Sequence, residues 1–200
     1  MARPINPQLA SERRHQILLA AATVFRSRGF HGARMEEICA AAQISPGSVY
    51  RHFASKEAII EAIVEIELAH YLQAIDQFLG STEALKRLMT IDEASLRRLI
   101  EPHEYDVGQE SWLEIMRNPR LGALAAKADT KLRKQIIKSL QRAQQAGEIE
   151  SSLDAVGVGN VLMALFSGIA FDADLDPRYN LAKIAITLKI LFRRFLLPHT

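Results

Sequence analysis

Long stretches without glycine or proline, in which apolar residues recur every three or four positions, restrict this chain to helical folds. Only 10 Gly and 7 Pro occur among the 200 residues, so few positions favour a turn. One apolar stripe continues over residues 64–79, and no window alternates long enough to predict a strand. The sequence therefore predicts an all-α protein of about nine helices, at residues 11–29, 34–42, 46–53, 55–79, 82–100, 104–117, 119–146, 153–171 and 178–196.

The composition excludes several classes of protein. Hydrophobic residues make up 48% of the chain and charged residues 24%, which is usual for a globular protein and rules out a wholly disordered one. The single cysteine, Cys39, excludes an intrachain disulfide and a cysteine-based zinc cluster. No apolar run reaches about 18 residues, and the N-terminus lacks the apolar segment of a secretory signal. We therefore expect a soluble, cytoplasmic protein.

Positive charge is concentrated at the start of the chain. Residues 1–56 carry eight basic and three acidic side chains, a net charge of +5, whereas the remaining residues carry −3. This division predicts an anionic partner that contacts only the N-terminal part, and nucleic acid is the first candidate. Residues 1–10 contain two prolines and no apolar periodicity, so a flexible tail is expected there.

Residues 29–59 carry the most informative pattern in the chain. Two short helices, 34–42 and 46–53, are separated by three residues, which is the spacing of a helix-turn-helix whose second helix fits the DNA major groove. Ile44 and Val49 are expected to fill the wedge between the two helices. The exposed face of the second helix then carries the polar residues Ser48, Tyr50, Arg51 and His52.

This region resembles the TetR/AcrR family of transcriptional regulators. The resemblance covers residues 12–72 and rests on Phe25, Gly29-Phe30, Met35, Ile38, the run ISPGSVYRHF and Ser55-Lys56-Glu57. It implies a helix-turn-helix DNA-binding domain over residues 11–56 and a helical ligand-binding and dimerisation domain over residues 57–200. The DNA contacts that it implies are Arg34, Pro46, Gly47, Ser48, Tyr50, Arg51, His52 and Lys56.

The resemblance also implies a role for each kind of contact. Tyr50 and His52 are expected to hold phosphates, and Lys56 is expected to hold the DNA backbone from the start of the fourth helix. Ser48 and Arg51 are expected to read bases, and an arginine that binds guanine through two hydrogen bonds contributes roughly 1–3 kcal/mol of discrimination.

Three positions depart from the family pattern. Gln43 stands where the family has the glycine of the turn, which predicts an unfavourable backbone angle at a residue with a Cβ atom. Arg34 stands where a small hydroxyl residue is usual, and Glu36 where a basic residue is common. We therefore expect no side-chain cap at Arg34, which is free instead to contact a phosphate.

The resemblance further implies a small-molecule pocket in the helical body, although no signature names the ligand. Aromatic and methionine side chains often line adaptable apolar cavities, and ordinary core packing is the alternative for each of them. The candidates are Tyr71, Phe78, Met89, Trp112, Met116, Met163 and Phe166. Residues 103–106 are predicted to form a solvated loop, with a pocket rim as the alternative.

The last two predicted helices have broad apolar stripes and are expected to form a homodimer interface. Two helices from each chain would then pack as a four-helix bundle, and burial within one chain is the alternative. The candidates are Val158, Val161, Leu162, Leu165, Ile169, Leu181, Ile184, Leu188, Leu191, Phe192 and Phe195. A two-fold dimer would read a near-palindrome whose half-sites lie about 34–36 Å apart or a little more.

No enzyme signature is complete in this sequence. The acidic run 172–176 resembles the start of a calcium loop, but Pro177 replaces the required glycine. Glu67 and His70 have the spacing of a di-iron ligand pair, which needs a second copy. Phosphate-binding and dinucleotide-binding glycine motifs and a nucleophile elbow are lacking. We therefore expect no catalysis, no metal and no cofactor.

The function that these observations favour is that of a dimeric transcriptional repressor, released from a near-palindromic operator by a small-molecule ligand. An activator and a ligand-independent regulator are the alternatives among DNA-binding proteins. A helical small-molecule-binding protein without DNA binding is the alternative from another class.

Overall fold

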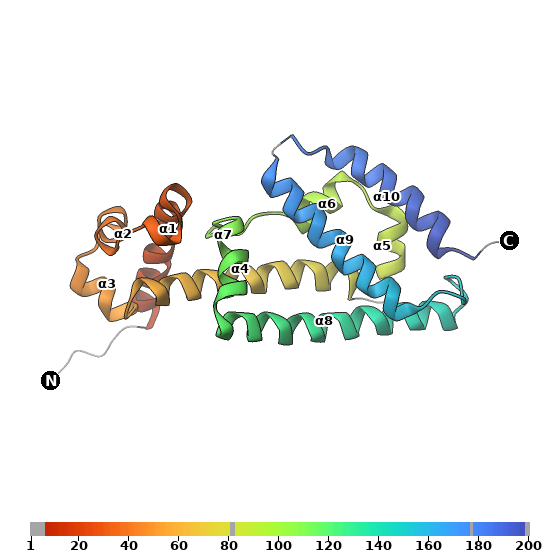
Figure 1. The fold of residues 1–200 in the computed structure, drawn as a ribbon, viewed down its shortest axis with the longest axis horizontal. Coiled ribbons are helices and arrows are strands. Elements are labelled where there is room, and N and C mark those ends of the chain that lie inside the picture. The colour runs from red at the N-terminus through yellow and green to blue at the C-terminus, as the bar shows by residue number, and fades with distance from the viewer. Residues whose placement is uncertain (1–6, 81–82, 177, 199–200) are drawn as a thin grey trace. The chain divides into compact units, whose positions relative to one another are not determined.

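Ten helices follow one another in the computed structural model, and no strand occurs within residues 7–80, 83–176 and 178–198, which the structure describes. The all-α architecture predicted from the periodicity is confirmed, with ten helices in place of about nine. The helices, shown in Figure 1, are α1 (Pro7–Gly32), α2 (Met35–Ala42), α3 (Pro46–His52), α4 (Lys56–Leu79), α5 (Ala84–Thr90), α6 (Glu93–Leu99), α7 (Gln109–Arg117), α8 (Pro119–Gln145), α9 (Ala155–Leu175) and α10 (Leu181–Leu196).

The additional helix arises because the segment predicted as one helix over 82–100 is divided into α5 and α6. The backbone of Ile91 leaves the helical region, with φ −49° and ψ 134°. Asp92 then caps α6, because its carboxylate accepts a hydrogen bond from the Ser95 N–H at 2.8 Å. Residue 82 itself lies outside the described residues.

Helix α1 begins before its predicted start and breaks where predicted. It begins at Pro7, so the described end of the expected tail is helical, and residues 1–6 lie outside the described residues. Gly29 interrupts the helix with φ 67° and ψ 169°, a conformation that residues with a Cβ atom rarely adopt. The Phe30 ring packs back edge-to-face on Phe25, with 4.9 Å between centroids. The chain thus breaks its regular helix at Gly29, as predicted, although α1 continues after this kink to Gly32.

Two other boundaries differ from the prediction. Helix α7 begins at Gln109 rather than near residue 104, because residues 102–108 form a loop that ends at Gly108, with φ 67°. Helix α9 continues to Leu175, so most of the acidic run is helical rather than a loop.

The chain divides into two compact units, and unit 1 comprises Met1–Leu68 and Pro102–Gly122. Its buried core joins α1, α2, α3 and the first part of α4, and Tyr105, Val107 and Leu121 complete it from the second segment. Unit 1 therefore extends beyond residue 56, where the motif ends, because residues 102–122 bury apolar side chains in the same core.

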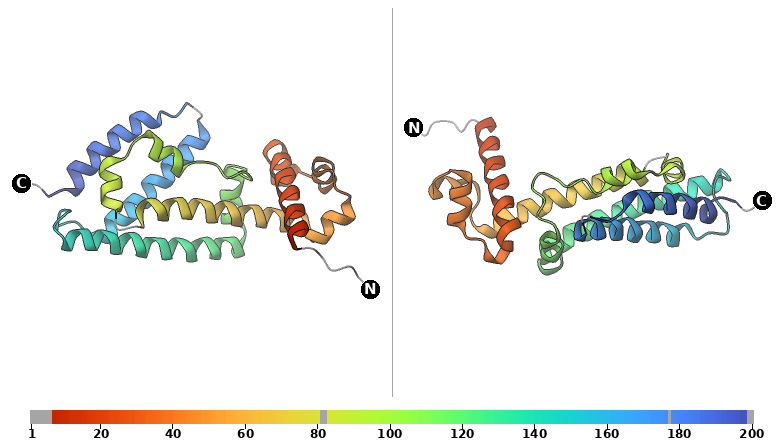
Figure 2. Two further views of the ribbon diagram at one scale, coloured as in Figure 1. Left: turned by 180° about the vertical axis from the view of Figure 1, so that it is seen from behind. Right: turned by 90° about the horizontal axis from the view of Figure 1, so that it is seen from above.

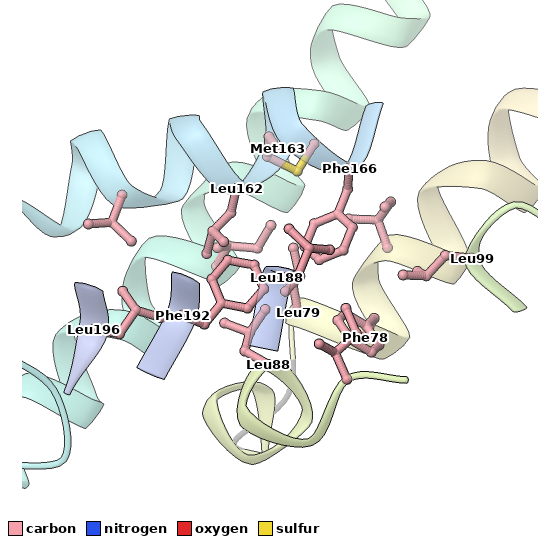
Figure 3. Packing of buried hydrophobic residues seen from close by; sticks show 14 of the residues in the cluster. Phe78, Leu79, Leu88, Leu99, Leu162, Met163, Phe166, Leu188, Phe192 and Leu196 are labelled. Carbon is pink, nitrogen blue, oxygen red and sulfur yellow. The ribbon is translucent and has the colours of Figure 1, made fainter. Parts of the chain in front are cut away.

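Unit 2 comprises Ala69–Glu101 and Ala123–Thr200. Helix α9 is drawn between α8 and α10 in Figure 1 and in the left view of Figure 2. Figure 3 shows its core, in which Phe78 and Phe166 meet edge-to-face with 5.5 Å between ring centroids. Phe192 follows at 6.4 Å from Phe166. A Cβ atom at Gly159 would lie 3.0 Å from Ile137, so the small residue allows α9 to approach α8 within the chain.

Helix α9 is, among the described residues, the one helix long and apolar enough to span a membrane by length and composition alone. Its apolar residues also serve the core, since Val158, Leu162, Met163 and Phe166 are buried in unit 2. Packing within the unit therefore accounts for much of its hydrophobicity.

Candidate nucleic-acid interface

The turn between α2 and α3 is held in a left-handed conformation at Gln43, whose φ is 54° and ψ 38°. Gln43 is the one residue other than glycine with a positive φ in the described ranges. Its N–H donates to the Ala40 carbonyl, and the Ile44 N–H donates to the Cys39 carbonyl, each at 3.1 Å, which satisfies the end of α2. The predicted unfavourable angle at Gln43 is confirmed, and such a conformation costs about 1–2 kcal/mol at a residue with a Cβ atom.

Helix α3 is fixed to unit 1 through one apolar side. Val49 and Phe53 are 0% and 3% exposed, and the Arg14 guanidinium lies 4.3 Å from the centre of the Phe53 ring. Ser45 occupies the predicted N-cap position, and its carbonyl accepts hydrogen bonds from the next turn, although its side chain makes no capping bond. The buried side sets which residues of this short helix face outward.

The opposite side of α3 is polar and accessible. Tyr50 is 50% exposed, Arg51 is exposed and His52 is half-buried. The Arg51 guanidinium donates to the Ser48 hydroxyl at 3.1 Å, so the two expected base-reading residues lie together. Because this side makes no contribution to the buried core of unit 1, its polar groups are available to phosphates or base edges.

Gly47 leaves open space at the start of α3. A Cβ atom built there would meet no other atom within 4 Å, so packing within the chain does not require a glycine. Pro46, beside it, is also exposed and occupies the first turn. A missing side chain at an open helix start allows another molecule to approach the backbone closely.

Lys56, which is expected to hold the DNA backbone, also makes hydrogen bonds within unit 1. Its ammonium donates to the carbonyls of Phe30 and Ala33 at 2.8 Å each, and to that of His31 at 3.5 Å. These carbonyls lie in the last turn of α1 and just beyond it, and a cation stabilises the negative end of a helix. Lys56 is therefore a cap of α1 inside unit 1, which motif matching could not reveal because the contact spans 23 or more residues.

Arg34 is exposed at the N-cap position of α2. Its side chain makes no capping hydrogen bond, as predicted, but the Glu37 carboxylate accepts from its backbone N–H at 2.9 Å. The guanidinium of Arg34 thus remains at the surface. Sequence reasoning missed Arg14, whose nearness to α3 depends on the tertiary contact with Phe53.

Residues 103–106 lie in a loop, as predicted, but this loop belongs to unit 1 and is only partly solvated, with Glu104 exposed and Tyr105 buried. Tyr105 is buried, and its hydroxyl lies 2.5 Å from His15 Nδ1. Glu67 accepts a hydrogen bond from the Val107 N–H at 2.7 Å and another from the Ser111 hydroxyl. Burial raises the pKa of Glu67 to about 8, against the opposing effect of these hydrogen bonds, so the carboxyl is protonated at neutral pH. Glu67 therefore has a structural environment rather than that of a metal ligand.

Cys39 is buried in α2, as predicted, and burial raises the pKa of its thiol. A protonated, buried thiol is a poor nucleophile. Within the described ranges, no group of three or more histidine, cysteine or acidic side chains lies close enough to hold a metal ion.

Five of the seven ligand-pocket candidates meet in or against the core of unit 2, and the other two lie in unit 1. Phe78, Met163 and Phe166 are buried core residues of unit 2, while Tyr71 and Met89 pack partly against that core. Trp112 and Met116 belong to unit 1, where they are 41% and 75% exposed. These residues were chosen for their side-chain type and helical spacing. Their burial shows that five of them pack in or against the core of unit 2 and that the other two lie at the surface of unit 1.

The eleven dimer candidates also separate into two groups. Six are buried within the chain and two, Leu165 and Ile184, pack partly against its core, so the alternative of burial in one chain holds for them. The six are Val158, Leu162, Ile169, Leu181, Leu188 and Phe192. Three remain exposed, namely Val161, Leu191 and Phe195. The apolar stripes of α9 and α10 are wide, so the sequence alone could not show which of their residues face the core of the same chain.

The two short helices, their turn and the polar outer side of α3 together define a helix-turn-helix DNA-binding protein. Two family models match the sequence. The model described as bacterial regulatory proteins, tetR family, matches residues 17–63, and the model described as BetI-type transcriptional repressor, C-terminal, matches residues 84–196. The chain belongs to the TetR family of transcriptional regulators, which are DNA-binding regulators and not enzymes.

Relatives extend this likeness over most of the chain. The HTH-type transcriptional regulator UidR of Escherichia coli is 29% identical over 188 residues, covering 91% of this chain and 92% of UidR. The structure of Salmonella enterica GusR is 31% identical, covers 92% of this chain and 95% of its own, and has a TM-score of 0.54. A TetR transcriptional regulator from Chloroflexus aurantiacus is 20% identical over 94% of this chain and 98% of its own, and its TM-score of 0.72 reflects the shared fold.

Proposed function

We propose that this protein is a dimeric, cytoplasmic transcriptional repressor that a small-molecule ligand releases from a near-palindromic operator. The observation that carries the proposal is the division of α3 into a buried apolar side and an exposed polar side. Ser48 and Arg51 read base edges in the major groove, while Tyr50 and His52 hold phosphates. The open space at Gly47 admits the DNA backbone.

Dimerisation uses the apolar side chains of α9 and α10 that the chain leaves uncovered. They are Val156, Val161, Phe171, Leu175, Ile186, Ile190, Leu191 and Phe195. Two copies related by a two-fold axis cover both sets in a four-helix bundle. The dimer then offers two recognition helices to DNA, because one helix of seven residues reads few base pairs.

Repression is favoured because the matched C-terminal model describes a transcriptional repressor. A ligand that binds in unit 2 favours a state of the dimer that does not fit the operator. For a 100-fold loss of DNA affinity, the ligand must favour that state by about 2.7 kcal/mol.

The test is selection of binding sites from a random duplex library by the purified full-length protein at moderate salt. We expect a near-palindrome, bound with an affinity that falls steeply as salt rises, because phosphate contacts release counterions. Reporter expression from a promoter that carries the selected site then distinguishes a repressor from an activator.

Arg34→Gln is the matched variant, because Arg34 is exposed and has no capping role for its side chain. It should lower affinity for all sequences alike and reduce the salt dependence by about one phosphate contact. Absence of DNA binding at every salt concentration would overturn the proposal and leave a helical small-molecule-binding protein.

A further inference from the structure

Unit 2 contains an open cleft of about 820 Å³ between the second half of α4 and helices α5, α6 and α8. Only one of the residues expected to line a ligand pocket, Phe78, lines this cleft. The polar wall is formed by Asp76, Gln77, Arg87, Thr90, Ser95, Arg98 and Gln135. It differs from the apolar, methionine-rich pocket that the sequence predicts.

The acidic and basic side chains of this wall differ in the interactions that they make within the chain. The one carboxylate, that of Asp76, accepts a hydrogen bond from the Gln135 amide at 3.1 Å, which bridges α4 and α8. A Cβ atom at Gly80 would overlap Asp76, so this carboxylate is also confined by the end of α4. Asp76 is thus held at the side of the cleft formed by α4 and α8, whereas Arg87 and Arg98 come from α5 and α6.

The two guanidinium groups remain available to a ligand. Of the ion pairs within the described ranges, none includes Arg87 or Arg98. Arg98 donates to the Ser95 hydroxyl at 3.3 Å, and Asp92 near it is occupied in capping α6. Arginine presents a planar set of donors that matches a carboxylate or a phosphate.

Apolar groups complete the cleft beside these cations. Ala74, Phe78 and Leu99 line it, and Phe78 and Leu99 are largely covered by the core of unit 2. A ring or short apolar body can pack on this surface while its charged group reaches the arginines.

We propose that this cleft binds a small organic anion, whose carboxylate or phosphate is held by Arg87 and Arg98 and whose apolar body lies against Phe78 and Leu99. That such an anion is the effector rests on the proposed function. The binding itself requires no DNA, so the two statements are tested separately.

The test is an NMR titration of the full-length protein with benzoate, phenyl phosphate and the neutral analogue benzamide. We expect at least one of the anions to bind tenfold or more tightly than benzamide and to shift the Nε–Hε signals of Arg87 and Arg98. Preference for benzoate assigns a carboxylate, and preference for phenyl phosphate assigns a phosphate. Arg87→Gln and Arg98→Gln should each weaken anion binding at least tenfold and leave benzamide binding unchanged.

Arg97 is the matched control, because it neighbours Arg98 on α6, pairs with Glu93 at 2.5 Å and does not line the cleft. Arg97→Gln should bind the anions as the unaltered protein does. Equal affinity for benzoate, phenyl phosphate and benzamide, or equal losses in the Arg97 and Arg98 variants, would overturn the proposed site. If an anion binds as expected but the selected DNA site is retained, the site stands and its effector role is refuted.

Discussion

Units 1 and 2 are both helical, but different interactions hold their helices. In unit 1, charged and polar side chains reach backbone groups far along the chain, as Lys56 does at the end of α1 and Glu67 at Val107. Gln16 similarly donates from α1 to the Ala42 carbonyl of α2 at 2.8 Å. Both units have a buried apolar core, and in unit 2 the core of aromatic and aliphatic side chains from several helices, shown in Figure 3, makes the main contacts between helices. Removing a charge should therefore destabilise unit 1 at these polar contacts, and reducing side-chain volume should destabilise unit 2 in its core.

The largest effect is expected from removing a core ring in unit 2. Phe192→Ala should lower the free energy of unfolding by about 3–5 kcal/mol, because a cavity replaces a buried ring. Chemical denaturation at fixed protein concentration measures this change. Phe195→Ala, on the same helix but 47% exposed, is the control and should instead weaken the dimer, as sedimentation would show. Equal losses of stability in both variants would contradict the division between core and interface.

Removing the cap of α1 tests the polar character of unit 1. Lys56→Met keeps the length of the side chain but leaves the carbonyls of Phe30 and Ala33 without their charged donor. We expect a loss of about 1.5–3 kcal/mol of unfolding free energy, measured by denaturation without DNA. Arg34→Met should stay within about 0.5 kcal/mol of the unaltered protein. Unchanged stability in Lys56→Met, with reduced DNA affinity, would instead favour the phosphate contact first expected.

The pH dependence of stability provides a second test of unit 1. Because burial raises the pKa of Glu67 to about 8, the folded protein keeps a proton that the unfolded chain loses above its ordinary value. Stability should therefore fall as pH rises towards 8, by about 1 kcal/mol or more between pH 6 and 8. Glu67→Gln, which resembles the protonated acid, should remove this part of the slope. An unchanged slope in urea denaturation at several pH values would show that the carboxyl is ionised in the folded state.

The smallest effect concerns the turn. Gln43→Gly should raise the unfolding free energy by about 0.5–1 kcal/mol, because relief of the left-handed angle exceeds the added freedom of the unfolded chain. Gln43→Ala, which keeps the Cβ atom, should bring no gain. Thermal denaturation of the pair measures the difference, and a gain from alanine as large as that from glycine would disprove strain at this position.

The two units also differ in what their sequences could predict. The break in α1 at Gly29, the turn at Gln43 and the buried side of α3 depend on residues close in sequence, so local rules sufficed. The contacts of Lys56 and Arg14 depend on tertiary packing, which no local pattern encodes. In α9 and α10, apolar residues surround most of the helix, so periodicity could not separate residues such as Leu188 and Leu191.

Local sequence patterns also could not predict the proposed ligand site. Aromatic and methionine residues were good candidates by type, but Phe166 fills the core of unit 2 and Met116 lies at the surface of unit 1. The cleft is lined instead by charged residues of α5 and α6, whose approach to α4 only the fold reveals.

The proposed function depends most on the exposed side of α3 reading DNA, and Arg51→Gln tests this directly. Arg51 is exposed, so the variant should keep its stability. When binding sites are selected again from the random library, we expect the preferred base to change at one position in each half-site. Affinity for the original site should fall by roughly 1–3 kcal/mol. Recovery of the same site with unchanged affinity would contradict the assignment of α3 as the recognition helix.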